Sequence, residues 1–372
     1  MYVVTPEDTS RPSGAFAVRV RAREWWERVN RAGAYAVAAA FVNGDFEIDG
    51  DLLAAIRWWQ DGRVDRPADR IMRLLGPLWI ESWLQSPTRA RRNIRFHYDR
   101  SNRFYQQFLD RRMVYSCAYF SDPAASLEDA QVNKLDHICR KLNLGRDETF
   151  LDVGCGWGAL VMHAVERYGV TAVGCTLSAT QVEFGRDAVR RRGLADRIVI
   201  EDMDYRGVPG SFDKIASVGM YEHVGRRRLT AYFRTLAARL EPGGLFLNHG
   251  IARPQAVADD SSTRFIRRRV FPGGELPHLS DVVRAAEDAG FEVVDVENLR
   301  LHYALTCAHW VARLQEHRDA CLAEVDAATY RTWLLYLAVA AVNFERGETD
   351  VYQTLLARRG PRARSRLARA GV

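Results

Sequence analysis

The sequence predicts an α/β protein in which a doubly wound parallel sheet, with helices on both faces, follows a smaller helical domain. Three observations predict this fold. From Glu148 onward, short apolar runs typical of strands alternate with segments of helical length. The first run leads into alternating glycines at residues 154, 156 and 158. Residues 15–92 read as helical and hold six of the nine tryptophans.

Each element follows from its own pattern. Short apolar runs rich in β-branched residues predict six strands, at residues 149–154, 171–176, 197–202, 212–219, 245–251 and 291–299. Between them, residues 179–192 and 227–240 have the length and apolar spacing of helices. After Leu301 the chain reads as helical to about Arg346. The strands therefore alternate with helices, as in a parallel sheet.

These patterns divide the chain into four predicted parts. Residues 1–14, rich in Pro, Ser and Thr, predict a flexible arm. Residues 15–92 predict the helical domain, which turn residues interrupt at 43–50. Residues 93–357 carry the sheet and predict the main domain. Residues 358–372 carry six arginines and predict a solvated basic tail.

Composition narrows the class of protein. The chain has 372 residues, a net charge of +6, 47% hydrophobic and 27% charged residues, which is typical of a folded soluble protein. This balance excludes a disordered, collagenous or coiled-coil protein. Six cysteines without a CxxC pair exclude a disulfide scaffold or a cysteine-based zinc module. They fit free thiols in a reducing cytoplasm.

The basic residues are almost all arginine. Only Lys134, Lys141 and Lys214 among the 53 basic residues are lysines. The excess of arginine over lysine has two explanations. Either the genome favours arginine codons, or the guanidinium groups bind phosphates. No nucleic-acid-binding motif is present, so a nucleic-acid partner is not expected. The most apolar runs, Gly33–Val42 and Trp333–Val342, are shorter than the roughly 20 residues that span a bilayer, and no signal-peptide pattern opens the chain.

The clearest local signal is a glycine-rich loop. The apolar strand Leu151–Val153 leads into Gly154, Gly156 and Gly158, and a helical segment follows. Glycines let the backbone turn tightly and let a ligand approach it closely. An ordinary turn is the alternative, but the position after the first strand of a βαβ series favours a nucleotide-type site. The GxGxG spacing, and the lack of a carboxylate at the tip of the second strand, fit NAD poorly.

The loop has the form Asp-x-Gly-x-Gly-x-Gly, which resembles motif I of class I S-adenosylmethionine (SAM) methyltransferases. This implies a Rossmann-like fold and SAM as the cofactor. Further segments resemble, as an ordered set, the cyclopropane-fatty-acyl-phospholipid synthase family, which includes the mycolic acid cyclopropane synthases. The resemblance runs from about Arg92 to Arg359. The segments are His97–Asn102, Phe108–Asp110, Met113–Phe120, Thr176–Ser178 with Gln181, Met220–Gly225, Phe271–Pro277, and His302–Tyr303 with Thr306 and Trp310.

The resemblance implies a role for each of the two domains. Residues 93–357 would be a SAM-dependent catalytic domain, and residues 15–92 a lipid-associated domain. The implied reaction adds a methylene group from SAM to the cis double bond of an unsaturated acyl chain on phospholipid. A carbocation forms, and loss of a proton from the new methyl group closes a cyclopropane ring. That proton is very acidic, so the base needs position and shielding from water rather than strength.

In this family the base is a bound bicarbonate ion. The resemblance carries its pocket onto Cys117, Glu222, His249, Ile251 and Tyr303. Backbone N–H groups, an imidazole and a phenol donate hydrogen bonds to an anion, and Glu222 would accept from the bicarbonate O–H. Structural alternatives are a small buried hydrophobe at Cys117, a helix N-terminal acid at Glu222, a core histidine at His249 and packing alone at Tyr303.

The resemblance carries the cofactor pocket onto a second set of residues. The three loop glycines would admit the methionine part and the ribose, and Thr176 and Gln181 would bind the ribose hydroxyls. Asp204 would accept from the adenine amino group, with a turn-forming role as the alternative. The aromatic face of Tyr115 suits a sulfonium, while Asp152 would hold the glycine loop. The cofactor residues are Tyr115, Ser116, Gly154, Gly156, Gly158, Thr176, Gln181, Met203 and Asp204.

One departure from the family leaves the substrate open. Arg267–Val270 precedes Phe271–Gly274, where the family has Ile or Tyr-Ile. This favours a different lipid, or arginine contacts with a phosphate head group or an acyl-carrier phosphopantetheine. The alternative activity is a related C-methyltransferase that gives a methyl- or methylene-branched acyl chain or acts on a small-molecule alkene. An ordinary methyltransferase of a small metabolite and an inactive lipid-binding protein are further alternatives.

The same features predict where the protein acts. The tryptophans of residues 15–92 are core residues or anchors at a membrane interface. Arginines near anionic lipid would add electrostatic attraction. The expectation is therefore a cytoplasmic homodimer, peripheral to the inner face of the membrane, with an unsaturated acyl phospholipid as its partner.

Overall fold

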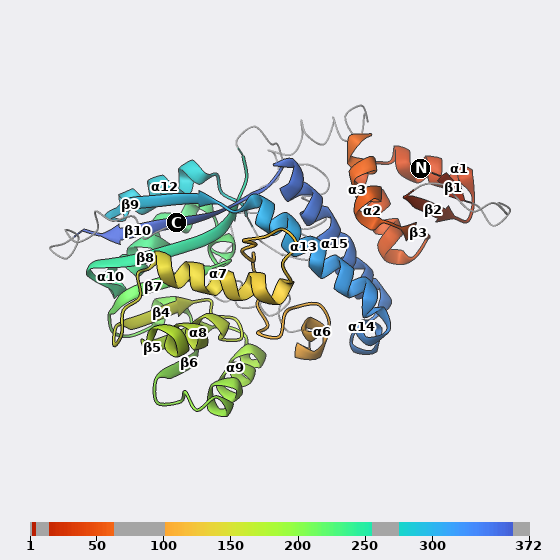
Figure 1. Cartoon of the computed structure of the whole chain (residues 1–372). Helices are drawn as coiled ribbons and strands as arrows, with labels where there is room; N and C mark the ends of the chain where they lie inside the picture. The colour runs from red at the N-terminus through yellow and green to blue at the C-terminus, as the bar shows by residue number, and fades with distance from the viewer. Residues whose placement is uncertain (1, 5–14, 63–100, 255–274, 360–372) are drawn as a thin grey trace.

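A seven-stranded sheet forms the centre of the molecule (Figure 1). The computed structural model describes residues 2–4, 15–62, 101–254 and 275–359. The strand order is β6-β5-β4-β7-β8-β10-β9. The strands are β4 (Thr149–Val153), β5 (Thr171–Thr176), β6 (Ile198–Asp202), β7 (Phe212–Val218), β8 (Leu240–Ala252), β9 (Phe291–Asn298) and β10 (Asp350–Arg358).

The predicted α/β fold is confirmed, and one strand was not predicted. The six predicted strands are β4 to β9, and the pairs among β4 to β8 are parallel. The seventh strand, β10, lies antiparallel between β8 and β9. Its sequence follows a long helix and was left unassigned. Insertion of this strand makes a mixed sheet, in which β9 still runs in the direction of β8.

Helices cover both faces of this sheet. Phe150 of β4 packs in a core with α7 (Leu127–Lys141), α8 (Ala159–Tyr168) and α9 (Ala179–Arg191). Leu151, the next residue, packs in a second core with α10 (Leu229–Arg239) and α12 (Leu279–Asp288). Because successive side chains point to opposite faces of a strand, β4 is apolar on both sides. Its carboxyl end therefore holds the following loop between two helical layers.

A helical layer extends the molecule past one end of the strands, to the right of the sheet in Figure 1. It contains α13 (Arg300–Glu316), α14 (Arg318–Glu324) and α15 (Ala327–Arg346), with the short α6 (Asn102–Gln106) beside α14. Helix α15 is buried along most of its length, because α13 lies on one side of it and the N-terminal elements on another (Figure 1). The apolar run from Trp333 to Val342 is thus a core helix.

The N-terminal elements form a mixed unit, so the prediction of a purely helical domain is wrong. The strands β1 (Tyr2–Val4), β2 (Phe16–Val20) and β3 (Phe46–Gly50) make a small sheet. The apolar run Phe16–Val20, with the β-branched residues Val18 and Val20, was a strand signal that the helical interpretation overlooked, and all of it except Arg19 is buried. The helices α1 (Arg23–Arg31), α2 (Ala34–Asn43) and α3 (Leu52–Asp61) complete the unit.

Two predicted segments fall partly outside the described residues. The predicted flexible arm includes Tyr2–Val4, which instead pairs in parallel with β2. The predicted basic tail begins at Arg358, which is the last residue of β10. The boundary predicted between residues 92 and 93 lies outside the described residues and stays a prediction.

Polar contacts attach the N-terminal unit to α15. The Arg57 guanidinium pairs with Glu345 at 2.7 Å, and Arg346 pairs with Asp61 at 2.6 Å. Between these ion pairs the Gln60 amide donates to Asn343 at 2.8 Å. Apolar side chains of both parts share one core. The N-terminal unit therefore packs directly on α15, the helix that also packs against α13.

The described tryptophans of this unit are core residues. Trp26 is buried, and Trp25 and Trp58 pack against the same core. Trp79 and Trp83 lie outside the described residues. In the described parts of the chain, no helix is long and apolar enough to cross a membrane.

Candidate active site

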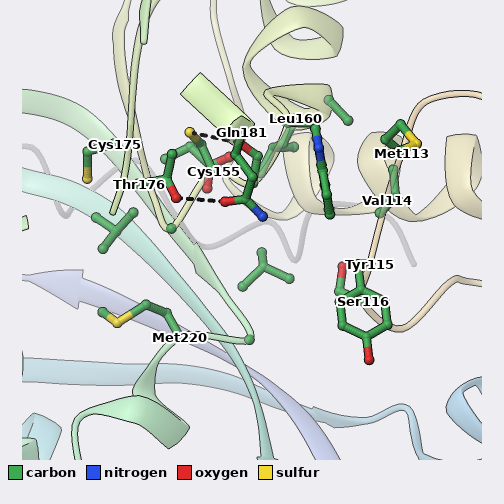
Figure 2. Close-up of a pocket in the computed structure, with 18 of the residues that line it drawn as sticks. Met113, Val114, Tyr115, Ser116, Cys155, Leu160, Cys175, Thr176, Gln181 and Met220 are labelled. Carbon is green, nitrogen blue, oxygen red and sulfur yellow. Dashed lines mark hydrogen bonds between the residues drawn. The ribbon is translucent and has the colours of Figure 1, made fainter. Parts of the chain in front are cut away.

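A cavity opens at the carboxyl ends of the central strands, where β4 and β5 give way to the helices that follow them (Figure 2). The loop after β4 forms one wall, and the segment 113–116 closes another. Seven of the predicted cofactor residues line this cavity. They are Tyr115, Ser116, Gly154, Gly156, Thr176, Gln181 and Met203.

Gly156 leaves room for a ligand against the backbone. Its φ is +53°, a left-handed conformation that side chains with a Cβ rarely adopt. A Cβ built on Gly156 would meet no heavy atom within 4 Å, although the residue lines the cavity. The space beside this residue is therefore available to a group of the ligand. This fits the predicted SAM site.

Thr176 and Gln181 lie side by side in the cavity wall, as predicted for residues that bind hydroxyl groups. The Thr176 hydroxyl donates to Gln181 Oε1 at 2.8 Å (Figure 2). Ser178, between them, caps α9 by accepting from the Gln181 backbone N–H at 3.5 Å. This cap fixes the start of α9 and with it the position of Gln181. Acceptor and donor atoms at the tip of β5 thus stand where a ribose would lie.

Two predicted cofactor residues do not line the cavity. Gly158 stands at the start of α8, behind the loop. The Asp204 carboxylate accepts from the Arg206 backbone N–H at 3.0 Å and pairs with the Arg206 guanidinium at 2.6 Å. These contacts match the alternative that was considered for Asp204, a turn-forming acid. Its neighbours Met203 and Tyr205 line the cavity instead.

Two buried ionisable residues line the cavity: Asp152, which was expected to hold the glycine loop, and Lys134, which was missed at the sequence level. Both residues are almost fully buried. Burial raises the pKa of Asp152 to about 7, against the opposing effect of Lys134. Burial lowers the pKa of Lys134 to about 8, while Asp110, Cys117 and Asp152 oppose that shift. The Lys134 ammonium and the Asp152 carboxylate partly neutralise each other. They line the part of the cavity where the methionine part of SAM would need polar partners.

Helix α7 holds the segment that carries Tyr115 and Ser116. The Lys134 ammonium donates to Ser116 Oγ at 2.9 Å, and the Gln131 amide donates to the Ser116 carbonyl at 2.9 Å. Gln131 and Lys134 stand on the buried stripe that Leu127 and Ile138 define. Two polar residues on an apolar helical stripe are the signal that could have identified them, and the rarity of lysine in this chain strengthens it.

Glu222 belongs to a second group of predicted site residues, next to the cofactor cavity. The short 3-10 helix η4 (Tyr221–His223) follows β7, with Met220 and His223 facing the cofactor cavity. Glu222 Oε1 accepts from the Ile251 backbone N–H of β8 at 2.7 Å. Glu222 Oε2 is buried and has no hydrogen-bond partner in the part of the chain that the structure describes. Burial raises the pKa of Glu222 to about 7, and the Ile251 N–H opposes the rise.

Gly250 allows η4 to approach β8 this closely. A Cβ on Gly250 would lie 2.1 Å from Cε1 of Tyr221, so no other residue fits beneath that ring. The Tyr221 hydroxyl donates to the Ile251 carbonyl at 2.9 Å. Together with the Glu222 bond, both backbone groups of Ile251 are held by η4. Sequence reasoning did not identify Gly250, because the close contact depends on two elements 30 residues apart.

His249 lies two residues before Ile251 on the same face of β8. It is 2% exposed, and its Nε2 has no hydrogen-bond partner among the described residues. Burial lowers the pKa of His249 to about 3, and the nearby cations Lys134 and Lys141 add to the shift. The imidazole is therefore neutral, with a buried Nε2 that no described residue satisfies.

Cys117 and Tyr303 meet at one carbonyl. The Cys117 thiol donates to the Leu299 carbonyl at 3.7 Å, and the Tyr303 N–H donates to the same oxygen at 3.1 Å. The Tyr303 ring stacks on Phe344 with 4.5 Å between centroids. Burial raises the pKa of Tyr303, and the charges of Cys117 and Glu222 contribute to the rise. The structure thus brings together Cys117, Glu222, His249, Ile251 and Tyr303.

Aromatic rings enclose the approach to both groups of residues. Tyr115, which lines the cavity, lies 5.1 Å from Trp310, 5.7 Å from Tyr105 and 5.8 Å from Trp333, centroid to centroid. Such a cluster excludes water and presents π faces that stabilise a positive charge. The arginines before Phe271, and Phe271–Gly274 themselves, lie outside the described residues. Across residues 2–4, 15–62, 101–254 and 275–359, no three His, Cys, Asp or Glu side chains are grouped to hold a metal ion.

Comparisons with known proteins agree with this geometry. Residues 85–354 match the family model described as mycolic acid cyclopropane synthetase. A probable fatty acid methyltransferase from Pseudomonas putida is 42% identical over 331 residues, which cover 86% of this chain and 81% of the relative. Cyclopropane mycolic acid synthase 3 from Mycobacterium tuberculosis is 36% identical over 281 residues, which cover 71% of this chain and 96% of the relative.

A solved structure shares the fold. The crystal structure of the mycolic acid cyclopropane synthase CmaA1, complexed with SAH and CTAB, aligns with a TM-score of 0.70 and 34% sequence identity. The alignment covers 74% of this chain and 99% of that one. The unmatched part of this chain is consistent with the additional N-terminal unit.

Proposed function

Since the chain belongs to the mycolic acid cyclopropane synthetase family of SAM-dependent methyltransferases, we propose that it acts on the cis double bond of an unsaturated acyl chain of a phospholipid. The family resemblance inferred from the sequence is confirmed. SAM-dependent methylation of lipid chains is the activity that its relatives share. The product that we propose is a cyclopropane ring.

The observation that carries this proposal is a pair of buried atoms that have no hydrogen-bond partner in the described parts of the chain. Glu222 Oε2 accepts hydrogen bonds, and His249 Nε2 is a ring nitrogen that donates when it carries the proton. A buried polar atom without a partner costs stability of about 1–3 kcal/mol. Bicarbonate has both an O–H donor and acceptor oxygens, so it would satisfy Glu222 and His249 together. The effect of the Glu222 charge on the pKa of Tyr303 supports placing the pocket carried over from the family here.

The proposed chemistry balances at each step. Bound SAM supplies an electrophilic methyl group on sulfur. The π electrons of the acyl chain form the new C–C bond as the C–S bond breaks, which leaves a carbocation on the chain. The bicarbonate base would take a proton from the new methyl group, and the electrons of that C–H bond close the ring. Glu222 and His249 hold and orient the base, while the aromatic rings around Tyr115 exclude water.

Mass spectrometry of lipids from a bacterial host that expresses the chain tests this function. The expected product carries one additional CH₂ per modified acyl chain and resists mild hydrogenation, as a ring does. An unchanged lipid profile, with active SAM binding, would contradict the proposal. A Glu222→Gln strain is the control for enzymes of the host.

A methyl- or methylene-branched product is the second candidate. The relative from Pseudomonas putida, which is named a probable fatty acid methyltransferase, favours it. The two candidates share the carbocation and differ in which proton the base removes. Loss of a proton from a chain carbon leaves a methyl branch with a chain double bond, and loss of a methyl proton after a hydride shift leaves a methylene branch. Both branched products take up hydrogen and the ring does not, so the hydrogenation step of the same experiment separates the two candidates.

We further propose that the protein is a homodimer that binds the cytoplasmic face of the membrane peripherally. The excess of arginine and the net charge of +6 support attraction to anionic lipid. Flotation with anionic phospholipid vesicles should show binding that weakens as salt is raised, because salt screens exposed charges. Absence of binding at low ionic strength would count against a phospholipid substrate. Analytical ultracentrifugation tests the dimer.

A further inference from the structure

A row of polar side chains crosses the sheet next to the proposed bicarbonate site. His249 of β8 and Gln353 of β10 are direct partners, and Gln353 is also the direct partner of Glu297 of β9. Direct partners of an antiparallel pair present their side chains on the same face. Gln353 is fully buried, at 0% exposure. A glutamine amide buried in the middle of a sheet costs stability unless it forms hydrogen bonds.

The contact between Gln353 and His249 fixes the position of a proton. Gln353 Nε2 lies 3.3 Å from His249 Nδ1. An amide nitrogen donates hydrogen bonds and does not accept them, so Nδ1 must be the acceptor. A neutral imidazole carries one proton, which must then be on Nε2. The Nε2 atom is the one that has no hydrogen-bond partner among the described residues.

The other neighbour of Gln353 does not compete for its amide. Glu297 Oε2 pairs with His137 Nε2 at 2.7 Å and with the Lys141 ammonium at 2.6 Å. These partners hold the pKa of Glu297 at about 2, against its partial burial. Glu297 Oε2 is thereby satisfied by two residues of α7. The Gln353 amide is left to the histidine.

We infer that Gln353 is a positioning residue that holds His249 as the Nε2–H tautomer, so that a neutral ring presents an N–H to the anion. The inference rests on the proposed function for the identity of the anion. The tautomer follows from the amide orientation, in which Gln353 Nε2 faces His249 Nδ1 and Gln353 Oε1 is buried without a partner among the described residues. With the opposite tautomer, Nε2 would present a lone pair to an anion, and the two would repel. Gln353 thus acts on the proposed base only through His249.

Nuclear magnetic resonance tests the tautomer without lipid or bicarbonate. The full chain is labelled with ¹⁵N-histidine, and two-bond ¹H–¹⁵N spectra report which ring nitrogen carries the proton. The His249 signals are those missing from a His249→Gln variant. In wild type the proton is expected on Nε2. In Gln353→Glu a carboxylate accepts from the ring, so the proton should move to Nδ1.

Kinetics provide the second measurement. In buffer stripped of carbon dioxide, the KM for added bicarbonate should rise roughly ten- to hundredfold in Gln353→Glu, the usual effect of losing one hydrogen bond to a charged group. SAM affinity should remain as in wild type. Thr354→Val is the matched control, because Thr354 is a buried polar residue on the opposite face of β10. It should change neither measurement.

The NMR spectra and the kinetics each have a result that would contradict a proposal. A proton on Nδ1 in wild type, or an unmoved proton in Gln353→Glu, would overturn the inference. If Gln353→Glu does not fold, Gln353→Met removes the donor at similar size, and its His249 ring should exchange between both tautomers. A wild-type rate that ignores bicarbonate would refute the proposed base, whereas the spectra would still decide the role of Gln353.

Discussion

The backbone N–H of Ile251 donates to Glu222 Oε1 at 2.7 Å, and Glu222 Oε2 is buried without a partner among the residues that the structure describes. This single bond sets the carboxylate on β8 beside His249. It also changes one expectation, because the Ile251 N–H that was expected to face the bicarbonate is occupied by Glu222. In this arrangement Ile251 orients the acid that would bind the ion.

Replacing Glu222 with Gln should abolish most of the turnover and spare the cofactor. The amide keeps the bond to Ile251 but presents an N–H where the bicarbonate O–H needs an acceptor. Loss of one such positioned group typically lowers the rate by about 10²–10³. Turnover is measured on unsaturated phospholipid vesicles without and with bicarbonate, and SAM affinity by calorimetry. An active Glu222→Gln enzyme with unchanged bicarbonate dependence would disprove this role.

The same substitution should change how stability depends on pH. The pKa of Glu222 is raised from 4.5 to about 7 by burial, so the folded state favours the protonated form. Its contribution to stability is complete below pH 4.5 and is lost as the pH rises towards 7. Glu222→Gln has no charge to bury and should therefore gain stability relative to wild type across this window, by at most about 3 kcal/mol.

Denaturant unfolding at several pH values measures that difference. Glu287→Gln, at an exposed position of α12, removes the same charge without burial and is the control. A stability difference between wild type and Glu222→Gln that does not vary with pH would contradict the raised pKa.

Gly156→Ala should weaken SAM binding by tenfold or more, because the new Cβ enters the space beside the loop and strains the backbone at φ +53°. Gly193→Ala has nearly the same strain, at φ +67°, and equally open surroundings, but it lies in the turn after α9 rather than in the cavity wall. Calorimetry on both variants separates strain from ligand contact. Equal losses of affinity would reject the assignment of the cavity to SAM.

Lys134→Met should reduce SAM affinity, because Ser116 loses the ammonium that holds its hydroxyl at 2.9 Å and Asp152 loses its compensating charge. We expect a loss of roughly tenfold, the effect of one hydrogen bond to a charged group. Lys214→Met is the control, since Lys214 is also buried but donates to the Leu142 carbonyl, away from the cavity. If both variants bind SAM like wild type, Lys134 has no role in the site.

Local patterns predicted the sheet and the glycine loop but not the pairings between distant segments. The β4 loop was predictable because strand, glycines and helix follow each other within ten residues. Strand β10 was missed because its place between β8 and β9 depends on segments 50 to 100 residues away in the chain. Gln353 and Gly250 were missed for the same reason: each has meaning only through a partner on another element, Gln353 through His249 and Gly250 through Tyr221.

The site residues also differ in whether the sequence could predict their contacts. Cys117, Glu222, His249, Ile251 and Tyr303 were named through a family resemblance, and the structure brings them together from four separate segments. Asp204 was placed by its position after a strand, yet its carboxylate turns to Arg206. Arg206 takes up the Asp204 carboxylate that was expected to bind the adenine amino group. The spacing of residues in the sequence does not indicate to which of these two partners the carboxylate turns.

The strand order β8-β10-β9 has a consequence for synthesis on the ribosome. Strand β9 hydrogen-bonds to the sheet only through β10, which is made after it. While the chain emerges, β8 presents an open edge and β9 has no strand to join until residues 350–358 have left the exit tunnel. Such open edges promote association between neighbouring nascent chains. Ribosomes paused before that point would therefore carry chains that are especially dependent on chaperones.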